Sequence, residues 1–515
     1  MQDPYPVQPF INPCHATVRV PGSKSITNRA LAIASILPAK EEEITEGMEN
    51  VPALDLLNFL RSRDTEIMFH ALKALGKEVE ERQDSITRVS VSDSNCDFIP
   101  SLHVPLYKKS EILHHFPSNQ IERSSLPLFR EKTASINVGN AGTAARFLTA
   151  ILCLEEGGNY EVDGDEAMYR RPMKGLTDAL ASLGAEFEFH KTPGCIPFTL
   201  RTHGIKGDRV AVDASESSQI LSALLIMAAG VGRPFEVELT GKTVSEPFVE
   251  MTAKMLESFG AKVTVAEKCR YTVTGFHEAP FVNNIYDIEP DATAASYFLA
   301  LPIATGGTAT VADLGNCRLQ GDIRFVNVLR SAGLSVEGAL DIPEHPNLIR
   351  STAGKAPIRG VRADFEAFSD TFLTLAALTP LLDGVTRIEG IAHTRKQETD
   401  RVAAMARELR KLGQEVKEEE GALEVRPNLA ALKALAKAAR DKKTALGEGA
   451  GYVEIDTYKD HRFAMSFAVL GCRDLLGDGK PWLAIRDPLC CKKTFPNFFE
   501  VLEDARQQSQ GTVRL

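Results

Sequence analysis

Six short polar clusters in the chain each come directly before an apolar stretch that favours a helix. They lie at residues 22–25, 139–143, 215–219, 291–293, 369–371 and 459–462. The unpaired N–H groups and partial positive charge at a helix start attract phosphate and carboxylate groups. The clusters and the turns after them also carry reactive or charged side chains such as Lys24, Arg29, Asp370 and Arg462. If the six helix starts face one cleft, that cleft suits a ligand with several negative charges.

Taken singly, most of these clusters have an ordinary structural explanation. Residues 22–25, Gly-Ser-Lys-Ser, resemble a fragment of a phosphate-binding loop, but the full spacing of that loop is absent and a Ser-capped helix explains them equally well. Residues 398–401, Glu-Thr-Asp-Arg, open a further helix, where acids are ordinary partners of the helix dipole. Asp-His-Arg at 460–462 is harder to explain as a surface cluster. The pair His114–His115 has no partner ligands nearby and predicts no metal site.

The helices that carry these clusters recur at a regular interval. The successive markers Lys24, Gly142, Ser218, Asp291, Asp370 and His461 are 118, 76, 73, 79 and 91 residues apart. A second series, separated by 108, 76, 73 and 80 residues, consists of Gly76, Gly184, Gly260, Gly333 and Gly413. Each of these glycines ends a helical pattern before a β-rich run, which is typical of a helix C-cap. Both series indicate an α/β unit of about 75 residues, present six times.

Two inserts explain why some intervals are longer. Residues from about 95 to 131 contain several prolines and no clear periodicity, so we expect a surface excursion inside the first unit. Residues from about 427 to 450 predict an Ala/Lys-rich helix followed by a Gly-rich turn. Six units divide naturally into two lobes of three, with the midpoint near residue 290.

Composition narrows the class of protein. The 515 residues are 43% hydrophobic and 25% charged, which is typical of a globular chain and excludes a disordered, collagen-like or coiled-coil protein. The net charge of −10 argues against general nucleic-acid binding. No apolar run reaches the roughly 18 residues that a membrane helix needs. We therefore expect small-molecule substrates, and neither a nucleic acid nor a membrane as partner.

The first ten residues and the cysteines bear on the compartment. Residues 1–10 lack the basic start and apolar core of a signal peptide. The nine cysteines show no C-x-x-C spacing, and the adjacent pair Cys490–Cys491 suits neither a zinc site nor an ordinary disulfide. We expect a cytoplasmic protein with reduced thiols and no bound metal.

Taken together and in order, the motifs resemble the 5-enolpyruvylshikimate-3-phosphate synthase family, whose members are also called 3-phosphoshikimate 1-carboxyvinyltransferases. The matching stretches are PGSKSITNRAL at 21–31, GNAGTAARFL at 139–148, YRRPM at 169–173, VDASESSQ at 212–219, DATAASYFLA at 291–300, LQGDIRF at 319–325, ETDR at 398–401, YKDHR at 458–462 and DPLCCKKTFP at 487–496. Single pieces are weak, but the ordered set is highly specific. The resemblance covers nearly the whole chain outside the two inserts.

The resemblance implies an α/β (α+β) enolpyruvyl transferase fold with two lobes, each built from three βαβαββ units. In this family the N-terminal strand belongs to the second lobe, so the chain crosses between lobes twice, here near residues 21 and 290. We therefore expect one lobe from residues 22–289, including the 95–131 insert, and the other from residues 1–21 and 290–515.

The resemblance also implies the reaction. The enolpyruvyl group of phosphoenolpyruvate moves to the 5-hydroxyl of shikimate 3-phosphate and phosphate is released, by addition followed by elimination. This reaction belongs to the shikimate pathway, which leads to chorismate and the aromatic amino acids, and the family is the target of glyphosate. No metal or organic cofactor takes part, and we expect a monomer.

Residue roles follow from the family match, position by position. The expected catalytic groups are Asp370 as base for the 5-hydroxyl, Glu398 at the methylene carbon, and Lys24, which assists proton transfer and steadies the leaving phosphate. The expected phosphoenolpyruvate ligands are Lys24, Asn140, Gly142, Arg171, Gln219, Arg401, Arg462 and Lys493. The expected shikimate 3-phosphate ligands are Ser25, Arg29, Ser217, Ser218, Gln219, Ser245, Asp370 and Gln397.

The sequence departs from the family pattern at four of the positions expected near the substrates. Phe248 and His393 stand where many members have Tyr and Asn, while Gln397 and Lys459 stand where many have Lys and Asn. Lys396, one position before Gln397, is placed to compensate in part. We expect these changes to affect the binding of the substrate phosphates and the sensitivity to inhibitors more than the reaction itself.

Two alternative functions remain open. UDP-N-acetylglucosamine enolpyruvyl transferases share the fold and the donor, but they usually carry a catalytic Cys before an Arg-Pro pair, and the corresponding stretch DGDEAMYRRP has none. A non-catalytic paralogue that only binds phosphorylated ligands would have no need for both carboxylates and all the matched cations.

Overall fold

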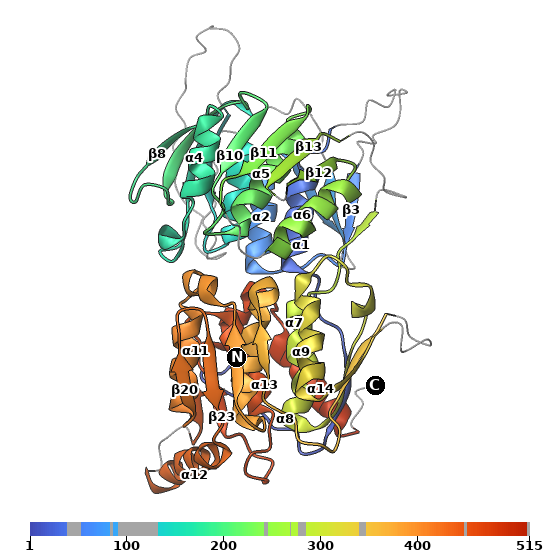
Figure 1. Cartoon of the computed structure of the whole chain (residues 1–515), viewed down its shortest axis with the longest axis vertical. Coiled ribbons are helices and arrows are strands. Elements are labelled where there is room, and N and C mark those ends of the chain that lie inside the picture. Colours follow the sequence, from blue (N-terminus) through green and yellow to red (C-terminus); the bar gives the residue numbers. More distant parts are fainter. Residues whose placement is uncertain are drawn as a thin grey trace, which may run out of the picture.

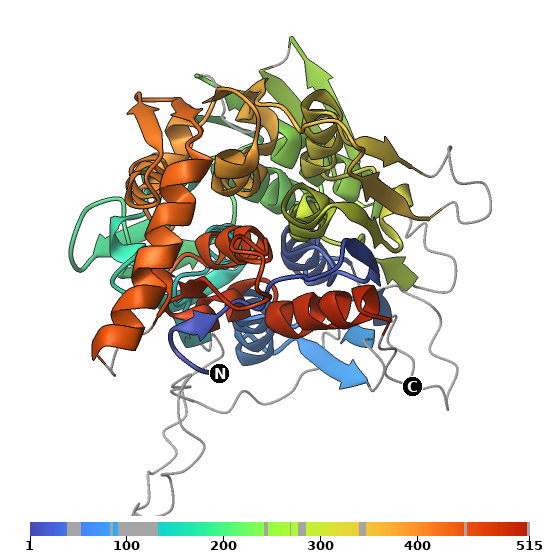
Figure 2. The same cartoon turned by 90° about the horizontal axis from the view of Figure 1, so that it is seen from below.

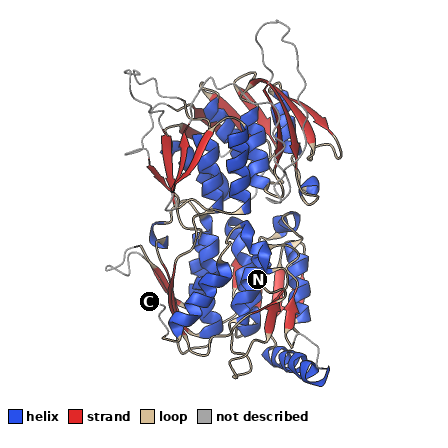
Figure 3. Ribbon diagram, turned by 180° about the vertical axis from the view of Figure 1, so that it is seen from behind, coloured by secondary structure: helices blue, strands red, loops and turns tan. Residues whose placement is uncertain are grey.

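The protein consists of two lobes stacked along its longest axis (Figure 1). The computed structural model describes residues 1–38, 53–82, 86–90, 132–241, 246–267, 269–276, 285–338, 347–446 and 451–511. These residues form six β-sheets, three in each lobe. In the upper lobe the helices gather at the centre and the strands lie outside them (Figure 3).

The three sheets of the first lobe have four strands each. In sheet order they are β14 (Ile285–Asp287), β3 (Ala53–Leu57), β5 (Ile86–Ser90) and β4 (Glu78–Arg82); β6 (Lys132–Asn137), β7 (Glu156–Asp163), β9 (Phe198–His203) and β8 (Glu186–Phe189); and β10 (Arg209–Val212), β11 (Phe235–Leu239), β13 (Arg270–Thr274) and β12 (Lys262–Ala266). The first two strands of each sheet are parallel and the others antiparallel.

The second lobe repeats this arrangement in two of its three sheets. Its sheets are β2 (Cys14–Val18), β15 (Gly307–Val311), β17 (Ile349–Thr352) and β16 (Ser335–Glu337); β18 (Arg362–Asp364), β19 (Thr386–Glu389), β21 (Leu423–Arg426) and β20 (Glu415–Glu418); and the three-stranded β1 (Tyr5–Pro6), β23 (Leu483–Ile485) and β22 (Val453–Ile455). The predicted α/β architecture with three units per lobe is confirmed.

Helices connect the parallel strands and form the interior of each lobe. The first lobe contains α1 (Lys24–Ala34), α2 (Arg63–Ala74), α3 (Gly142–Leu152), α4 (Lys174–Ser182), α5 (Ser218–Gly230) and α6 (Glu246–Ser258). The second contains α7 (Ala292–Leu299), α8 (Leu301–Thr305), α9 (Phe325–Ala332), α10 (Phe372–Leu378), α11 (Arg401–Lys411), α12 (Leu429–Leu446), α13 (His461–Gly471) and α14 (Phe498–Ser509). Every residue of α3, α10 and α13 is buried, as expected for helices that are apolar on all sides.

The first strand of one sheet in each lobe comes from a distant part of the chain. β2, from the N-terminus, pairs in parallel with β15, and β14 pairs in parallel with β3. The two connections between the lobes consequently run side by side. Gly22 and Pro290 form a β-bridge, and the N–H of Ser23 donates to the carbonyl of Glu289 at 2.8 Å.

The N-terminal segment is also anchored at the other end of the second lobe. Figure 2 shows this segment (dark blue) close to α14 (red). The N–H of His15 donates to Ser509 Oγ at 2.9 Å, and the N–H of Thr17 donates to Gln508 Oε1 at 3.0 Å. These contacts bind residues of β2 to the C-terminal helix of the same lobe.

Each lobe has its own hydrophobic core. One core contains buried side chains between Ile26 and Ile288, and the other contains side chains between Val7 and Val18 and between Ala292 and Ala505. The site between the lobes is therefore positioned by two separately packed bodies. No helix among the described residues has the length and apolar character required to cross a membrane.

The sequence-based expectations for local structure hold with two exceptions, at residues 369–371 and 398–401, and one gap. The five predicted capping glycines all have positive φ, from 77° at Gly413 to 106° at Gly333. The predicted Ala/Lys-rich helix is α12. The cluster at 369–371 differs, because it lies in a 3₁₀ helix, η5 (Glu366–Thr371), and α10 begins only at Phe372. The insert at 95–131 lies outside the described residues.

Candidate active site

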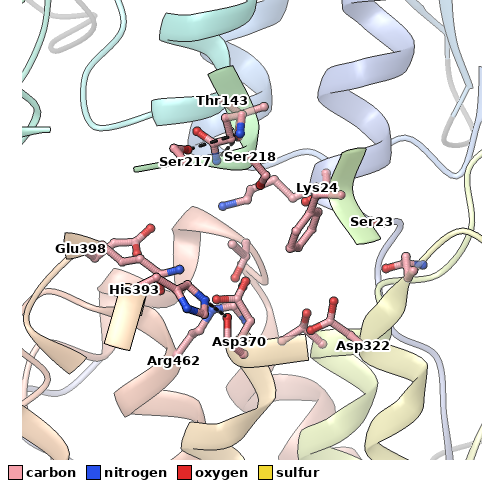
Figure 4. Close-up of a pocket in the computed structure, with 18 of the residues that line it drawn as sticks. Ser23, Lys24, Thr143, Ser217, Ser218, Asp322, Asp370, His393, Glu398 and Arg462 are labelled. Carbon is pink, nitrogen blue, oxygen red and sulfur yellow. Dashed lines mark hydrogen bonds and ion pairs between the residues drawn. The ribbon is translucent and has the colours of Figure 1, made fainter. Parts of the chain in front are cut away.

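One cavity between the lobes receives a residue from each of the six polar clusters. They are Lys24 from α1, Thr143 from α3, Ser218 from α5, Thr293 from α7, Asp370 from η5 and Arg462 from α13. Figure 4 shows Lys24, Ser217 and Ser218 above Asp370, His393 and Arg462. Helix starts that are 73 to 118 residues apart in sequence therefore face one space, and their dipoles make it attractive to anions.

The structure places most of the expected site residues around this cavity. Those that line it are Lys24, Ser25, Arg29, Arg171, Ser217, Ser218, Gln219, Asp370, Gln397, Glu398, Arg401 and Arg462. Asn140, Gly142 and Lys493 contact these residues from just behind them. Ser245 lies outside the described residues, so its expected role stays a prediction.

On the second-lobe side, two carboxylates are held by cations. Asp370 accepts from Arg401 Nη1 at 2.7 Å and from Arg462 Nη2 at 2.6 Å. Burial alone would raise the pKa of Asp370, but the two guanidinium groups, Arg462 first, outweigh it and hold the pKa below its ordinary value. Asp370 is therefore ionised at neutral pH, as a base must be.

Glu398 is ionised for the same kind of reason. It accepts from Lys493 Nζ at 2.9 Å and from Arg401 Nη2 at 2.8 Å. Burial again opposes ionisation, but Lys493, Arg401 and Arg171 hold the pKa of this carboxyl well below its usual range. In this ligand-free arrangement Glu398 is a proton acceptor.

Glu398 and its neighbours differ from the simplest sequence interpretation. The acids of residues 398–401 were expected in the first turn of a helix, but α11 begins at Arg401 and Asp400 caps it, accepting from the N–H of Ala403 at 2.9 Å. Glu398 lies before this cap and its side chain reaches the cavity. The capping role thus belongs to Asp400, which leaves Glu398 available for substrate.

On the first-lobe side, three arginines have no carboxylate within ion-pair distance among the described residues. Arg29, Arg146 and Arg171 are held instead by neutral oxygens. Arg29 Nε donates to Thr252 Oγ1 at 2.7 Å, Arg146 Nη2 donates to the carbonyl of Pro172 at 2.6 Å, and Arg171 Nη1 donates to the carbonyl of Asn140 at 3.2 Å. Burial lowers the pKa of Arg29 and of Arg146 to about 9. Such buried positive charge favours an anionic ligand.

Next to the cavity, a contact at Asn140 links the two lobes, and others lie within the first lobe. The carbonyl of Asn140 accepts from Arg171 of its own lobe and from Lys493 Nζ of the other lobe, the latter at 3.3 Å. Gln219, at the start of α5, accepts from Arg146 at 3.0 Å and donates to Thr143 at 3.2 Å. Lys24 Nζ lies 3.4 Å from Asp64. The cations expected to bind phosphoenolpyruvate thus lie on both sides of one gap.

Gly142 gives a direct test of how tightly this region is built. A Cβ at this position would lie 2.5 Å from Arg171 Nη2 and 2.6 Å from its Cζ. Gly142→Ala would therefore displace the Arg171 guanidinium. We expect the KM for phosphoenolpyruvate to rise by about tenfold, the loss expected for one charge-assisted contact, while the KM for shikimate 3-phosphate stays within about twofold.

Steady-state kinetics with each substrate varied in turn would measure this. Gly354→Ala is the matched control, because its Cβ meets nothing within 4 Å. An unchanged KM for phosphoenolpyruvate in Gly142→Ala would contradict the placement of Arg171 at the donor.

Three of the four positions that depart from the family pattern, Phe248, His393 and Gln397, line the same cavity, whereas Lys459 is exposed and is not among its lining residues. His393 Nε2 lies 2.8 Å from Ser369 Oγ, and the Phe248 ring lies 5.8 Å from the Arg29 guanidinium carbon. The side-chain oxygen of Gln397 accepts from Arg401. Lys459 has a positive φ of 59° and precedes the α13 cap Asp460.

Sequence reasoning did not select several residues that line the cavity. Thr143 and Arg146 belong to the helix start that the sequence identifies at residues 139–146, but they were assigned to neither substrate. Asp322 had no such signal. It is 4% exposed, lines the cavity, and its Oδ1 has no hydrogen-bond partner among the described residues. Only the three-dimensional structure brings it near Asp370.

Asp322 should destabilise the fold at neutral pH. Burial and the negative charge of Asp370 raise the pKa of Asp322 to about 7. When folding raises the pKa of a carboxyl, the protein loses stability as pH rises from the pKa of that carboxyl in the unfolded chain, near 4, to its pKa in the folded protein. Asp322→Asn removes that loss. We expect the melting temperature of this variant to exceed that of wild type by about 3 °C at pH 8 and to match it near pH 4.

Thermal unfolding of both proteins across this pH range would measure the effect. The exposed Asp504 supplies a control substitution, Asp504→Asn, which should leave the difference near zero at both pH values. A destabilised Asp322→Asn at pH 8 would show that the carboxylate has an ionic partner there.

Among the described residues, no group of three His, Cys, Asp or Glu side chains is arranged to hold a metal ion. His461 is fully buried, and burial together with Arg462 keeps its pKa well below the ordinary value. It is therefore a neutral ring behind Glu398 and Arg462.

Comparison with known proteins identifies the relatives of this chain. Residues 10–112 and 117–502 match the model of the family EPSP synthase (3-phosphoshikimate 1-carboxyvinyltransferase). A protein from Opitutus terrae named 3-phosphoshikimate 1-carboxyvinyltransferase is 42% identical over 513 residues, covering 99% of each chain. The chloroplastic protein of that name from Petunia hybrida is 34% identical, covering 95% of this chain and 82% of its own length.

A solved structure supports the fold independently. EPSP synthase from Acinetobacter baumannii superposes with a TM-score of 0.67 at 19% sequence identity, covering 97% of this chain and 98% of its own. The two-lobed enolpyruvyl transferase fold is thus confirmed, and with it the resemblance first noted in the motifs. Because the family match spans nearly the whole chain, the protein belongs to the EPSP synthase (3-phosphoshikimate 1-carboxyvinyltransferase) family.

Proposed function

We propose that the protein transfers the enolpyruvyl group of phosphoenolpyruvate to the 5-hydroxyl of shikimate 3-phosphate, releasing phosphate. One observation carries this beyond the family match. Two buried arginines, Arg29 and Arg146, and the half-buried Arg171 have no carboxylate partner among the described residues and face two ionised carboxylates across a single cavity. The arginines suit two small substrates that together carry two phosphates and two carboxylates. The carboxylates suit a reaction in which a hydroxyl loses a proton and a methylene carbon gains and then loses one.

The donor fits between the lobes. We assign it to the cations Lys24, Arg171, Arg401, Arg462 and Lys493, with Asn140, Gly142 and Gln219 beside them. Planar guanidinium groups make paired hydrogen bonds to phosphate and carboxylate, and the cross-lobe contact of Lys493 with Asn140 supports a donor that touches both lobes.

The acceptor fits against the first lobe. We assign it to Ser25, Arg29, Ser217, Ser218, Gln219 and Ser245 there, and to Asp370 and Gln397 opposite. The start of α5, where the Ser217 hydroxyl accepts from the N–H of Gln219 at 3.3 Å, offers N–H and hydroxyl donors to a phosphate.

The two carboxylates then move protons in opposite directions. In the addition, the 5-hydroxyl oxygen of shikimate 3-phosphate bonds to C2 of phosphoenolpyruvate while Asp370 takes the proton of that hydroxyl. Glu398 delivers a proton to the methylene carbon. In the elimination, Glu398 takes a proton back from that carbon, the double bond re-forms, and the C–O bond to phosphate breaks. Lys24 stabilises the departing phosphate.

Substrate binding explains how Glu398 acquires a proton. Contacts with Lys493 and Arg401 keep Glu398 ionised. The donor's own anionic groups compete for these cations, and any loss of their contact with Glu398 raises its pKa. The charged state seen without ligand is thus compatible with the role of proton carrier.

We also propose that the enzyme works as a monomer in the cytoplasm, with residues 22–289 as one lobe and residues 1–21 with 290–515 as the other. The distribution of the two hydrophobic cores supports these boundaries. The paired crossings at Gly22 and Pro290 suit a hinge that lets the lobes close and exclude water.

Phosphate release with defined substrates tests the function. Phosphate should appear only when phosphoenolpyruvate and shikimate 3-phosphate are both present. Release with UDP-N-acetylglucosamine as acceptor would instead identify the other enolpyruvyl transfer. Binding of both substrates by calorimetry without any phosphate release would identify a non-catalytic binding protein.

A further inference from the structure

An ion pair spans the cavity where the acceptor is expected. Lys396 Nζ lies 3.3 Å from Glu216 Oε1, and both residues line the cavity. Lys396 is the last residue of a 3₁₀ helix in the second lobe (Ala392–Lys396), whereas Glu216 directly precedes Ser217, the N-cap of α5 in the first lobe. The contact therefore brings a second-lobe ammonium group to the start of a first-lobe helix.

Other cations of the second lobe in this cavity are already engaged. Arg401 and Arg462 both contact Asp370. Gln397, next to Lys396, is neutral and its side-chain oxygen accepts from Arg401. Lys396, by contrast, has 66% of its side chain exposed and contacts a single exposed carboxylate. Such a pair is weak, so a more strongly charged anion at the same place can displace it.

We propose that Lys396 determines specificity for the phosphorylated acceptor, whose phosphate displaces Glu216 from the Lys396 ammonium group. This inference rests on the function proposed above and extends it to the acceptor's phosphate. A phosphate near pH 7 carries about −1.5 to −2 charges and three acceptor oxygens, against the single charge of Glu216. The ammonium group therefore exchanges Glu216 for the phosphate at the start of α5, without any covalent change.

The exchange would favour shikimate 3-phosphate over shikimate. Shikimate, which has no phosphate, does not displace Glu216 from Lys396, so its binding gains no contact with the Lys396 ammonium group. Because Lys396 belongs to the second lobe and Glu216 to the first, the exchange replaces one contact between the lobes with a stronger one when the phosphorylated acceptor is bound.

Steady-state kinetics of Lys396→Gln test the proposal. We expect the KM for shikimate 3-phosphate to rise by about tenfold, as for the loss of one charge-assisted hydrogen bond. The kcat and the KM for phosphoenolpyruvate should stay within about twofold, and Lys396→Arg should restore most of the loss. Lys417→Gln is the matched control, since Lys417 is 68% exposed in the same lobe and also pairs with one glutamate.

Glu216→Gln should act in the opposite direction. Lys396 is then unpaired before the acceptor arrives, so the KM for shikimate 3-phosphate should fall by about two- to fivefold. A KM that rises in Glu216→Gln, or does not change in Lys396→Gln, would overturn the proposal. Phosphate release by the wild-type protein separates the two questions, because it tests the proposed function without depending on Lys396.

Discussion

Asp370→Asn should lose about 10²- to 10⁴-fold of its turnover while the fold remains intact. The side chain of Asp370 accepts hydrogen bonds from Arg401 and Arg462. Only its ionised carboxylate can take up a proton. An amide of the same shape still accepts hydrogen bonds but cannot take the proton of the 5-hydroxyl. The loss should therefore fall on kcat, with much smaller changes in the KM of either substrate.

Two measurements isolate this effect from misfolding. Circular dichroism and thermal unfolding should show the same folded state, and Asp383→Asn, an exposed acid of the same lobe, should keep wild-type turnover. Near-normal kcat in Asp370→Asn would mean that another group deprotonates the acceptor. Asp322 would then be a candidate, because it lines the same cavity and the negative charge of Asp370 helps to raise its pKa.

The local structure of this protein could be predicted well from sequence because its signals are local. A polar residue before an apolar stretch predicts a helix start, and a glycine after one predicts its end. These rules placed the starts of α1, α3, α5 and α13 within a residue or two. Even the convergence of the helix starts followed from one further assumption, that repeated units pack in equivalent ways.

What the sequence alone could not supply depends on distant contacts. The pairing of β14 with β3 joins residues more than two hundred positions apart and leaves no local pattern. Backbone geometry also intervened at one site. Phe368, inside η5, has non-helical angles (φ −147°, ψ 45°), which kink this 3₁₀ segment two residues before Asp370.

The electrostatic environment of individual residues could not be predicted from the sequence either. No role was assigned to Asp322 from the sequence, and its raised pKa follows from its burial and from the negative charge of Asp370. Likewise the sequence indicates that Arg401 is a cation near a helix start, but not that three acids surround it. That environment makes Arg401 as important for folding as for binding.

Arg401→Met should lower the free energy of unfolding by about 3–5 kcal/mol at pH 8, the cost typical of breaking a buried ionic group by removing one partner. Arg401 is 1% exposed. Its Nε donates to Asp460 at 2.7 Å, while Nη1 and Nη2 donate to Asp370 and Glu398 at 2.7 and 2.8 Å. The other two acids keep a second cation, Arg462 or Lys493, but Asp460, which is fully buried, loses its guanidinium partner.

The pH dependence distinguishes this cause from loss of side-chain volume. Arg401 helps to depress the pKa of Asp370 and of Glu398, so the stability it provides is present above the unfolded carboxyl pKa and is lost as pH falls through the folded values. The deficit of Arg401→Met in urea unfolding should therefore persist from pH 8 to about 5 and shrink as the pH falls below about 4. Arg410→Met, at an exposed position of the same helix, should change stability by less than about 0.5 kcal/mol. Equal stability of Arg401→Met and wild type at pH 8 would show that these acids do not depend on Arg401, and a deficit independent of pH would assign its role to volume rather than charge.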